Sequence, residues 1–128
     1  MYNVILVGLG GFVGSVGRYL TYLLVSTYFN HSFPIATLLV NTIGCFAIGA
    51  LSATAGHYVA LSNPRILLLL TTGIIGGFTT FSAFGLETVE LIHLQPTLAM
   101  LNVIGNLLLG IGAVVGGQML ATAILGLL

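Results

Sequence analysis

Charged side chains are almost absent from this sequence. Its 128 residues include two Arg, two Glu and neither Lys nor Asp, so only 3% of the chain is charged and the formal net charge is zero. Soluble domains carry about 25% charged residues, and so few cannot cover a water-facing surface. A net charge of zero also leaves no electrostatic footprint for nucleic acid. Lipid is therefore expected to solvate the outside of the molecule.

Further absences exclude other classes of protein. Cys45 is the only cysteine, so no intrachain disulfide can form. No Lys or Arg precedes the first apolar run, so we expect a retained helix rather than a signal peptide. The early glycines resemble a dinucleotide fingerprint, but Val13 stands where its third Gly belongs. No set of nucleophile, base and acid is evident, and we predict that the protein is not an enzyme.

What the chain does contain is apolar sequence. Hydrophobic residues make up 58% of it, and the mean hydropathy is +1.20. Each apolar stretch exceeds the roughly 20 residues that cross a bilayer core, and a Pro stands near the start of the last three. We predict an all-α integral membrane protein, a single domain over residues 1–128, with transmembrane helices at about 3–28, 34–58, 65–94 and 97–127.

The arginines give no preferred orientation in the membrane. Four crossings place both termini and the Pro64 connection on one side, which Arg65 marks, whereas Arg18 lies late in the first helix and favours the other. With one Arg each way, the positive-inside rule is balanced. Such a chain could insert in both orientations and assemble as an antiparallel, dual-topology homodimer.

Glycine and threonine mark the third helix. The run from Thr71 to Ser82 combines three Gly with paired Thr, all weak helix formers. We predict a break in mid-membrane, where unwound backbone must be buried or line a wet cavity; a flexible glycine patch is the alternative. Glycines four residues apart, in the pairs 10/14 and 112/116, permit close helix approach within one chain or between subunits.

Polar side chains inside these helices are costly, so their spacing is informative. Two pairs share a helical face at i,i+4, and two phenylalanines follow at i,i+3 beside Thr and Ser. Interhelical hydrogen bonding and core filling are the alternatives to a functional role. Arg18 could snorkel or attract anions in a vestibule, and Glu87 is a functional candidate because it is a deep acid. The two i,i+4 pairs are Thr37 with Asn41 and Asn102 with Asn106, and the phenylalanines are Phe81 and Phe84, which lie beside Thr80 and Ser82.

Several of these motifs together resemble one family. The run Gly76–Thr88, reading GGFTTFSAFGLET, resembles the signature of the Fluc (CrcB) fluoride channels. The segments Gly10–Tyr19, Thr37–Asn41 and Asn102–Asn106 agree with that family in order and spacing. The resemblance covers essentially the whole chain. Ala83, Gly85 and Gly110 depart from it, since hydroxyl residues are common at these positions in the family.

The resemblance implies a passive fluoride channel of the bacterial inner membrane that relieves fluoride toxicity. It implies an antiparallel homodimer with two pores and a structural sodium ion at its centre, held by backbone carbonyls of Gly76 and Thr79. Arg18 corresponds to the family's vestibule arginine. The expected pore residues are Phe81, Phe84, Asn41, Thr37, Thr80, Ser82, Asn102 and Asn106.

Two other functions fit the composition. A proton-coupled small multidrug transporter also has four helices and dual topology, but it needs a deep acid in the first helix, which has none. An assembly subunit of a larger membrane complex fits the hydropathy equally well. It leaves the polar pairs and the third-helix pattern unexplained.

Overall fold

The computed structural model describes residues 1–29, 32–58 and 61–126, and over these ranges it is helical without strands. Helix α1 spans Tyr2–Tyr28, α2 spans Ile35–Thr54 and α6 spans Pro96–Gly126. The third stretch, Pro64–Leu94, is divided into α3 (Pro64–Leu68), the π-helical segment η1 (Leu69–Ile75), α4 (Gly76–Phe78) and α5 (Phe81–Leu94). All four stretches are long and apolar enough to cross a bilayer.

The helix boundaries follow local sequence signals. Pro64 and Pro96 occupy the first position of α3 and α6, where the missing N–H costs nothing. The second helix was expected to reach about residue 58, but α2 ends at Thr54 and continues as hydrogen-bonded turns. Gly56 lies in those turns, and its low helix propensity accounts for the earlier end.

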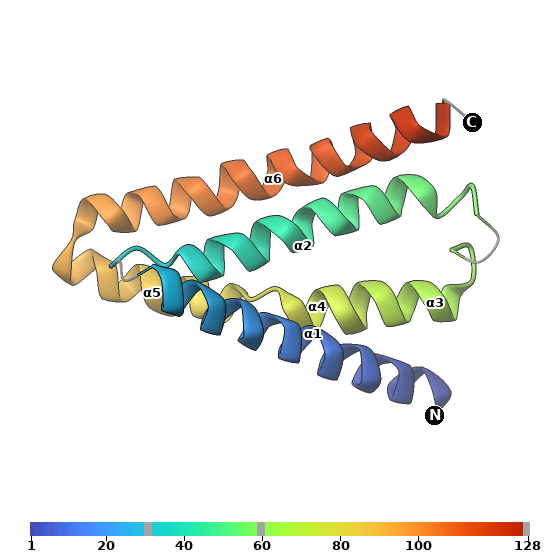
Figure 1. The fold of residues 1–128 in the computed structure, drawn as a ribbon, viewed down its shortest axis with the longest axis horizontal. Coiled ribbons are helices and arrows are strands. Elements are labelled where there is room, and N and C mark those ends of the chain that lie inside the picture. Colours follow the sequence, from blue (N-terminus) through green and yellow to red (C-terminus); the bar gives the residue numbers. More distant parts are fainter. Residues whose placement is uncertain (30–31, 59–60, 127–128) are drawn as a thin grey trace.

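The four stretches run alternately up and down the molecule (Figure 1). The start of α1, the end of α2, the start of α3 and the end of α6 lie at one end. The end of α1, the start of α2 and the α5–α6 connection lie at the other. Chain neighbours are not the main packing partners, however: α2 packs along α6, and α1 packs along η1 and α4.

Glycine makes both pairings possible. A Cβ on Gly10 would lie 2.8 Å from the Cα of Gly73, and one on Gly77 would lie 2.7 Å from the carbonyl oxygen of Gly11. These contacts join the backbones of α1, η1 and α4 directly. The Gly10/Gly14 pair therefore serves packing within the chain. A Cβ on Gly112 or on Gly116 would meet nothing within 4 Å, so that face of α6 is open.

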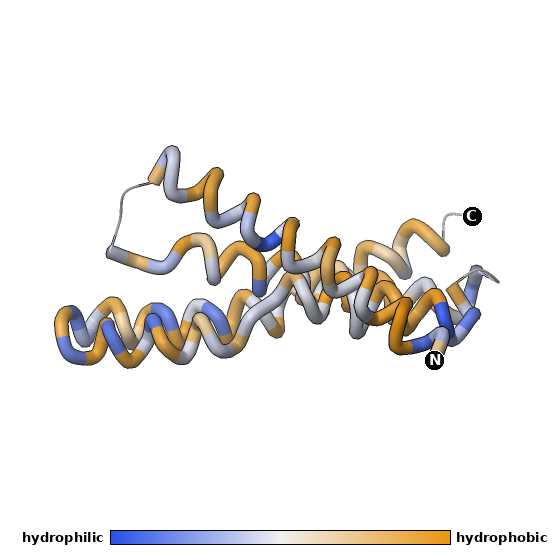
Figure 2. Tube along the Cα trace, turned by 90° about the horizontal axis from the view of Figure 1, so that it is seen from below, coloured by the Kyte–Doolittle hydropathy of each residue, from blue (hydrophilic) through white to orange (hydrophobic). Residues whose placement is uncertain are grey.

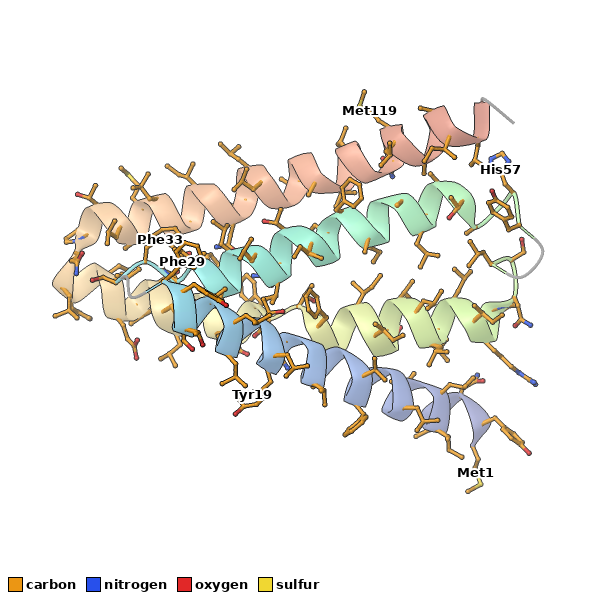
Figure 3. All side chains as sticks on the ribbon, in the orientation of Figure 1. Met1, Tyr19, Phe29, Phe33, His57 and Met119 are labelled. Carbon is orange, nitrogen blue, oxygen red and sulfur yellow. The ribbon has the colours of Figure 1, made fainter. Side chains whose placement is uncertain are left out.

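The distribution of polarity is inverted relative to a soluble protein. Apolar residues follow every long helix (Figure 2), and side chains such as Tyr19 and Met119 point away from the bundle (Figure 3). The largest fully buried side chains are Val40, Asn102 and Thr37, and two of these three are polar. An apolar exterior around a polar centre is the arrangement that a lipid solvent favours.

Candidate functional site

Two threonines separate α4 from α5. The backbone of Thr79 (φ −83°, ψ 160°) and that of Thr80 (φ −151°, ψ 118°) are extended rather than helical. Thr80 serves as the N-cap of α5, because its Oγ1 accepts a hydrogen bond from the Ala83 N–H at 3.2 Å. Threonine is well suited to interrupting the helix and to capping α5, since its β-branched side chain favours extended backbone and its hydroxyl can serve as an N-cap.

The side-chain amide of Asn41 on α2 holds this extended segment from both sides. Its Oδ1 accepts a hydrogen bond from the Thr80 N–H at 2.9 Å, and its Nδ2 donates to the Thr80 carbonyl at 3.1 Å. Thr80 is 6% exposed, so neither backbone group has ready access to solvent. Asn41 thereby satisfies two buried backbone groups that would otherwise be unpaired.

A relay of asparagines orients that clamp. Asn41 Nδ2 also donates to Asn106 Oδ1 at 3.0 Å, and Asn106 Nδ2 donates to both the carbonyl and Oδ1 of Asn102, at 3.0 and 2.9 Å. Asn102, which is fully buried, donates to Thr88 Oγ1 at 2.9 Å. Because Asn106 presents its nitrogen to Asn102, its oxygen must face Asn41. The relay thus fixes the orientation of every amide up to Thr80.

The interruption releases several backbone carbonyls from helical hydrogen bonding, those of Gly76 and Thr79 among them. In a continuous helix the Thr80 N–H would donate to the Gly76 carbonyl, but it donates to Asn41. The Ala83 N–H would likewise donate to the Thr79 carbonyl, but it donates to the Thr80 side chain. The Thr79 carbonyl accepts one long bond, 3.4 Å, from Arg18 Nη1.

These carbonyls have the chemistry of a site for a hard cation. Freed carbonyl oxygens at helix breaks are ligands for Na⁺ in membrane proteins, and the sodium site predicted at Gly76 and Thr79 stays a prediction. No cluster of three His, Cys, Asp or Glu side chains that could hold a metal occurs in the described ranges. The Arg18 guanidinium is a competing feature, because it occupies one lone-pair direction of the Thr79 oxygen.

A cavity of about 340 Å³ lies against the interruption. Phe81 and Phe84 form part of its wall, with ring centroids 5.4 Å apart and ring planes tilted by 56°. Asn41 and Asn106 line the same cavity, and none of its described lining residues is charged. The full lining is Asn41, Gly44, Cys45, Ile48, Ile75, Thr79, Thr80, Phe81, Phe84, Asn106 and Leu107.

Four of the residues predicted for the site lie beside this cavity rather than in its wall. Asn102 supports Asn106 from behind, and Ser82 is exposed, with its Oγ 3.2 Å from Thr80 Oγ1. Arg18 lines a neighbouring cavity of about 430 Å³ that shares Thr80 with the first. Thr37 lies fully buried four residues before Asn41. The pore and vestibule roles predicted for these four stay predictions, as do the pore roles predicted for the residues in the cavity wall.

Thr37 belongs to a second hydrogen-bonded group. Its hydroxyl donates to Glu87 Oε1 at 2.7 Å, and the Tyr22 hydroxyl is bonded to Thr37 Oγ1. Because the Thr37 proton is directed at the carboxylate, Tyr22 is the donor in that second bond. Glu87 Oε2 is buried, with no partner among the described residues. Glu87, flagged from the sequence as a deep acid, is thus tied to the helix that carries Asn41.

Sequence reasoning missed two members of these groups. Thr88 accepts the hydrogen bond that fixes Asn102, and Tyr22 completes the group around Thr37. Each bond joins different helices and so leaves no periodic signal within a helix. Thr88 stood inside the third-helix motif, but only the packing of α5 on α6 shows its partner.

Known proteins resemble this chain over most of its length. Residues 5–118 match the family described as CrcB-like protein, Camphor Resistance (CrcB). A protein of Ruminiclostridium cellulolyticum named fluoride-specific ion channel FluC is 43% identical over 125 residues, covering 97% of this chain and 95% of its own.

Two further relatives bear the same name. That of Chlorobaculum tepidum is 48% identical over 122 residues, covering 94% of this chain and 95% of its own. That of Methylobacillus flagellatus is 49% identical over 94 residues, which is 73% of each chain. These names describe a membrane channel and not an enzyme. On the extent of these matches and on its four apolar helical stretches, the chain belongs to the CrcB-like protein family.

Proposed function

We propose that this protein is a fluoride channel that mediates passive efflux from a bacterial cell across the inner membrane. The observation that carries the proposal is the cavity whose wall combines the Phe81–Phe84 pair with Asn41 and Asn106 and has no charged residue among its described lining. Three relatives of the chain are named for fluoride-specific conduction. Fluoride enters cells as neutral HF from acidic surroundings and is trapped as the anion, so a passive exit lowers its concentration.

The lining of the cavity suits a small, strongly hydrated anion. A pore must replace water with donors, and the Thr80 hydroxyl in the cavity wall keeps its proton free to donate when the Ser82 hydroxyl donates to it. The edges of the phenyl rings carry the positive part of the aromatic quadrupole and can face an anion without holding it tightly. Conduction requires binding that is weak enough to permit exit, and a wall without full charges provides it.

The exposure of Phe81 supports an antiparallel homodimer with two pores. This side chain lines the cavity but is 82% exposed, so one wall of the cavity is open in a single chain. A second copy would close that wall, and balanced arginines permit both orientations in the membrane. Each of the two equivalent cavities in such a dimer would be completed by residues of both subunits.

In the same assembly we place a structural sodium ion at the dimer centre, where the third stretch is interrupted in mid-membrane. The carbonyls of Gly76 and Thr79 would hold it, and the ion would offset the repulsion between carbonyl dipoles from two subunits. Replacing sodium by N-methylglucamine on both sides of a vesicle should slow fluoride efflux. Equal rates in the two media would contradict a role for the ion.

Fluoride efflux from liposomes tests the main proposal. Purified protein is reconstituted into vesicles loaded with fluoride or chloride, and release is followed with ion-selective electrodes. We expect rapid loss of fluoride without loss of chloride, and we expect Phe81→Ile to abolish it. Leu86→Ile is the matched control, because Leu86 is an exposed apolar residue of the same helix outside the cavity wall. No fluoride release from verified dimeric protein would overturn the proposal.

A further inference from the structure

A groove between α1 and α3 lies outside the site described above. Its volume is about 330 Å³, and it opens at the end of the bundle where α1 and α3 both begin (Figure 1). Fourteen residues separate Arg65 at its rim from Thr79, a helical rise of about 20 Å. The lining is Tyr2, Leu6, Asn63, Arg65, Ile66 and Leu69.

The groove is polar at its rim and apolar in its floor. Three side chains line the floor, Leu6, Ile66 and Leu69, and each is partly shielded from solvent. Tyr2 and Arg65 at the rim are exposed. A tyrosine and an arginine at the end of a transmembrane helix lie where lipid headgroups lie, because their polar tips reach water while their stems stay in hydrocarbon.

The rim offers hydrogen-bond donors with no side-chain partner among the described residues. The Arg65 guanidinium makes no side-chain hydrogen bond or ion pair with any described residue. Asn63 uses its Oδ1 to accept a hydrogen bond from the Arg65 N–H at 2.9 Å, which leaves its Nδ2 free to donate. A planar guanidinium beside an amide N–H is a donor set suited to a phosphate group.

The charge around the groove favours an anion. Both carboxylates of the sequence, Glu87 and Glu90, lie on α5, toward the opposite end of the bundle (Figure 1). No acidic side chain on α1 or α3 neutralises Arg65 among the described residues. A cationic rim above an apolar floor matches a ligand that is anionic at one end and apolar at the other.

We propose that this groove is a binding site for an anionic phospholipid. The phosphate is held by Arg65 and Asn63, and the first part of an acyl chain lies along Leu6, Ile66 and Leu69. Basic pockets between transmembrane helices bind lipid headgroups in this way. The apolar floor argues against free phosphate, which would gain nothing from it.

Native mass spectrometry of the detergent-purified protein tests the site. The protein is titrated with phosphatidylglycerol and with phosphatidylcholine of identical acyl chains, and bound lipid is counted by mass. We expect tighter binding of phosphatidylglycerol, weakened about fivefold by Arg65→Gln, the factor expected for one basic residue at an anionic surface. Arg65→Lys should retain most of the preference. Ile66→Asn should weaken binding of both lipids.

Arg18→Gln is the matched control, because it removes the same charge at a position outside the groove. The proposal is overturned if Arg65→Gln keeps the preference for phosphatidylglycerol, or if Arg18→Gln reduces it equally. It is also overturned if inorganic phosphate at millimolar concentration displaces phosphatidylglycerol completely, since the site would then recognise phosphate alone. Each variant is compared at equal folded fraction, as judged by circular dichroism.

Discussion

Replacing Asn41 by Leu should destabilise the protein through the backbone that its amide supports. The substitution keeps the approximate volume and removes three hydrogen bonds, two to Thr80 and one to Asn106. Interhelical bonds in membranes contribute about 0.6 kcal/mol each on average, which gives about 2 kcal/mol for three. Two buried backbone groups of Thr80 also lose their partners, at roughly 1 kcal/mol each. We expect a loss of about 2–4 kcal/mol.

The adjacent residue supplies the control. Thr42 Oγ1 is buried and has no hydrogen-bond partner among the described residues, so Thr42→Val removes a hydroxyl without removing a bond. This change should be neutral or stabilising, because an unpaired buried hydroxyl is unfavourable. Unfolding in sodium dodecyl sulfate, followed by circular dichroism, gives the free energy for both variants, and liposome efflux gives their activity. If Asn41→Leu were as stable as Thr42→Val, the amide clamp would not support the interruption.

Three further changes test other parts of the structure. Gly14→Ala should destabilise the protein by more than about 1 kcal/mol in the same unfolding assay, because the added Cβ would overlap the backbone of η1 and α4. Gly112→Ala should be neutral or up to about 1 kcal/mol stabilising, because its Cβ would meet nothing. Equal effects of the two substitutions would refute the packing role of Gly14. Asn102→Leu should cost about 2–4 kcal/mol and slow fluoride efflux, and unchanged efflux in a folded variant would remove the amide relay from function. Thr37→Val should lower the free energy of unfolding by about 1–3 kcal/mol, because Glu87 Oε1 loses its hydrogen-bond donor. Thr37→Ser keeps a hydroxyl and should restore most of that stability. If it does not, the shape of the side chain matters rather than the hydrogen bond.

The four helical stretches could be predicted because their signal is local. Hydropathy, length and the positions of Pro64 and Pro96 are properties of consecutive residues, and the observed ends differ from the predicted ones by at most one residue except near the end of α2. The π-helical segment η1 was not predicted. Leucines, threonines and a glycine are compatible with either helix type, and packing against α1 is not visible in the local sequence.

The sequence could predict which residues belong to the candidate site, but not which of them bond to one another. The i,i+4 spacing put Asn41 and Asn106 each on a polar face of its own helix, but it did not predict that the two meet across α2 and α6. Spacing could not show that Asn41 binds backbone rather than another side chain, because that depends on where the helix is interrupted. Nor could it separate Asn102, which is fully buried behind the cavity wall, from Asn106, which lines it. The two share a helical face, and only their different surroundings in the packed structure distinguish them.

The interleaved pairing of the helices bears on how the chain is made. The main partner of α1 ends at Phe78, fifty residues after Tyr28, and the contacts of α2 with α6 include Val114 and Gly117, sixty residues after Thr54. At about 5–20 residues per second, α1 waits roughly 3–10 seconds in the membrane before its partner is synthesised. During that time its glycine face is covered by lipid or by another nascent chain. Agents that bind the glycine face of α1 would therefore act on newly inserted protein and not on the finished bundle, in which η1 and α4 cover that face.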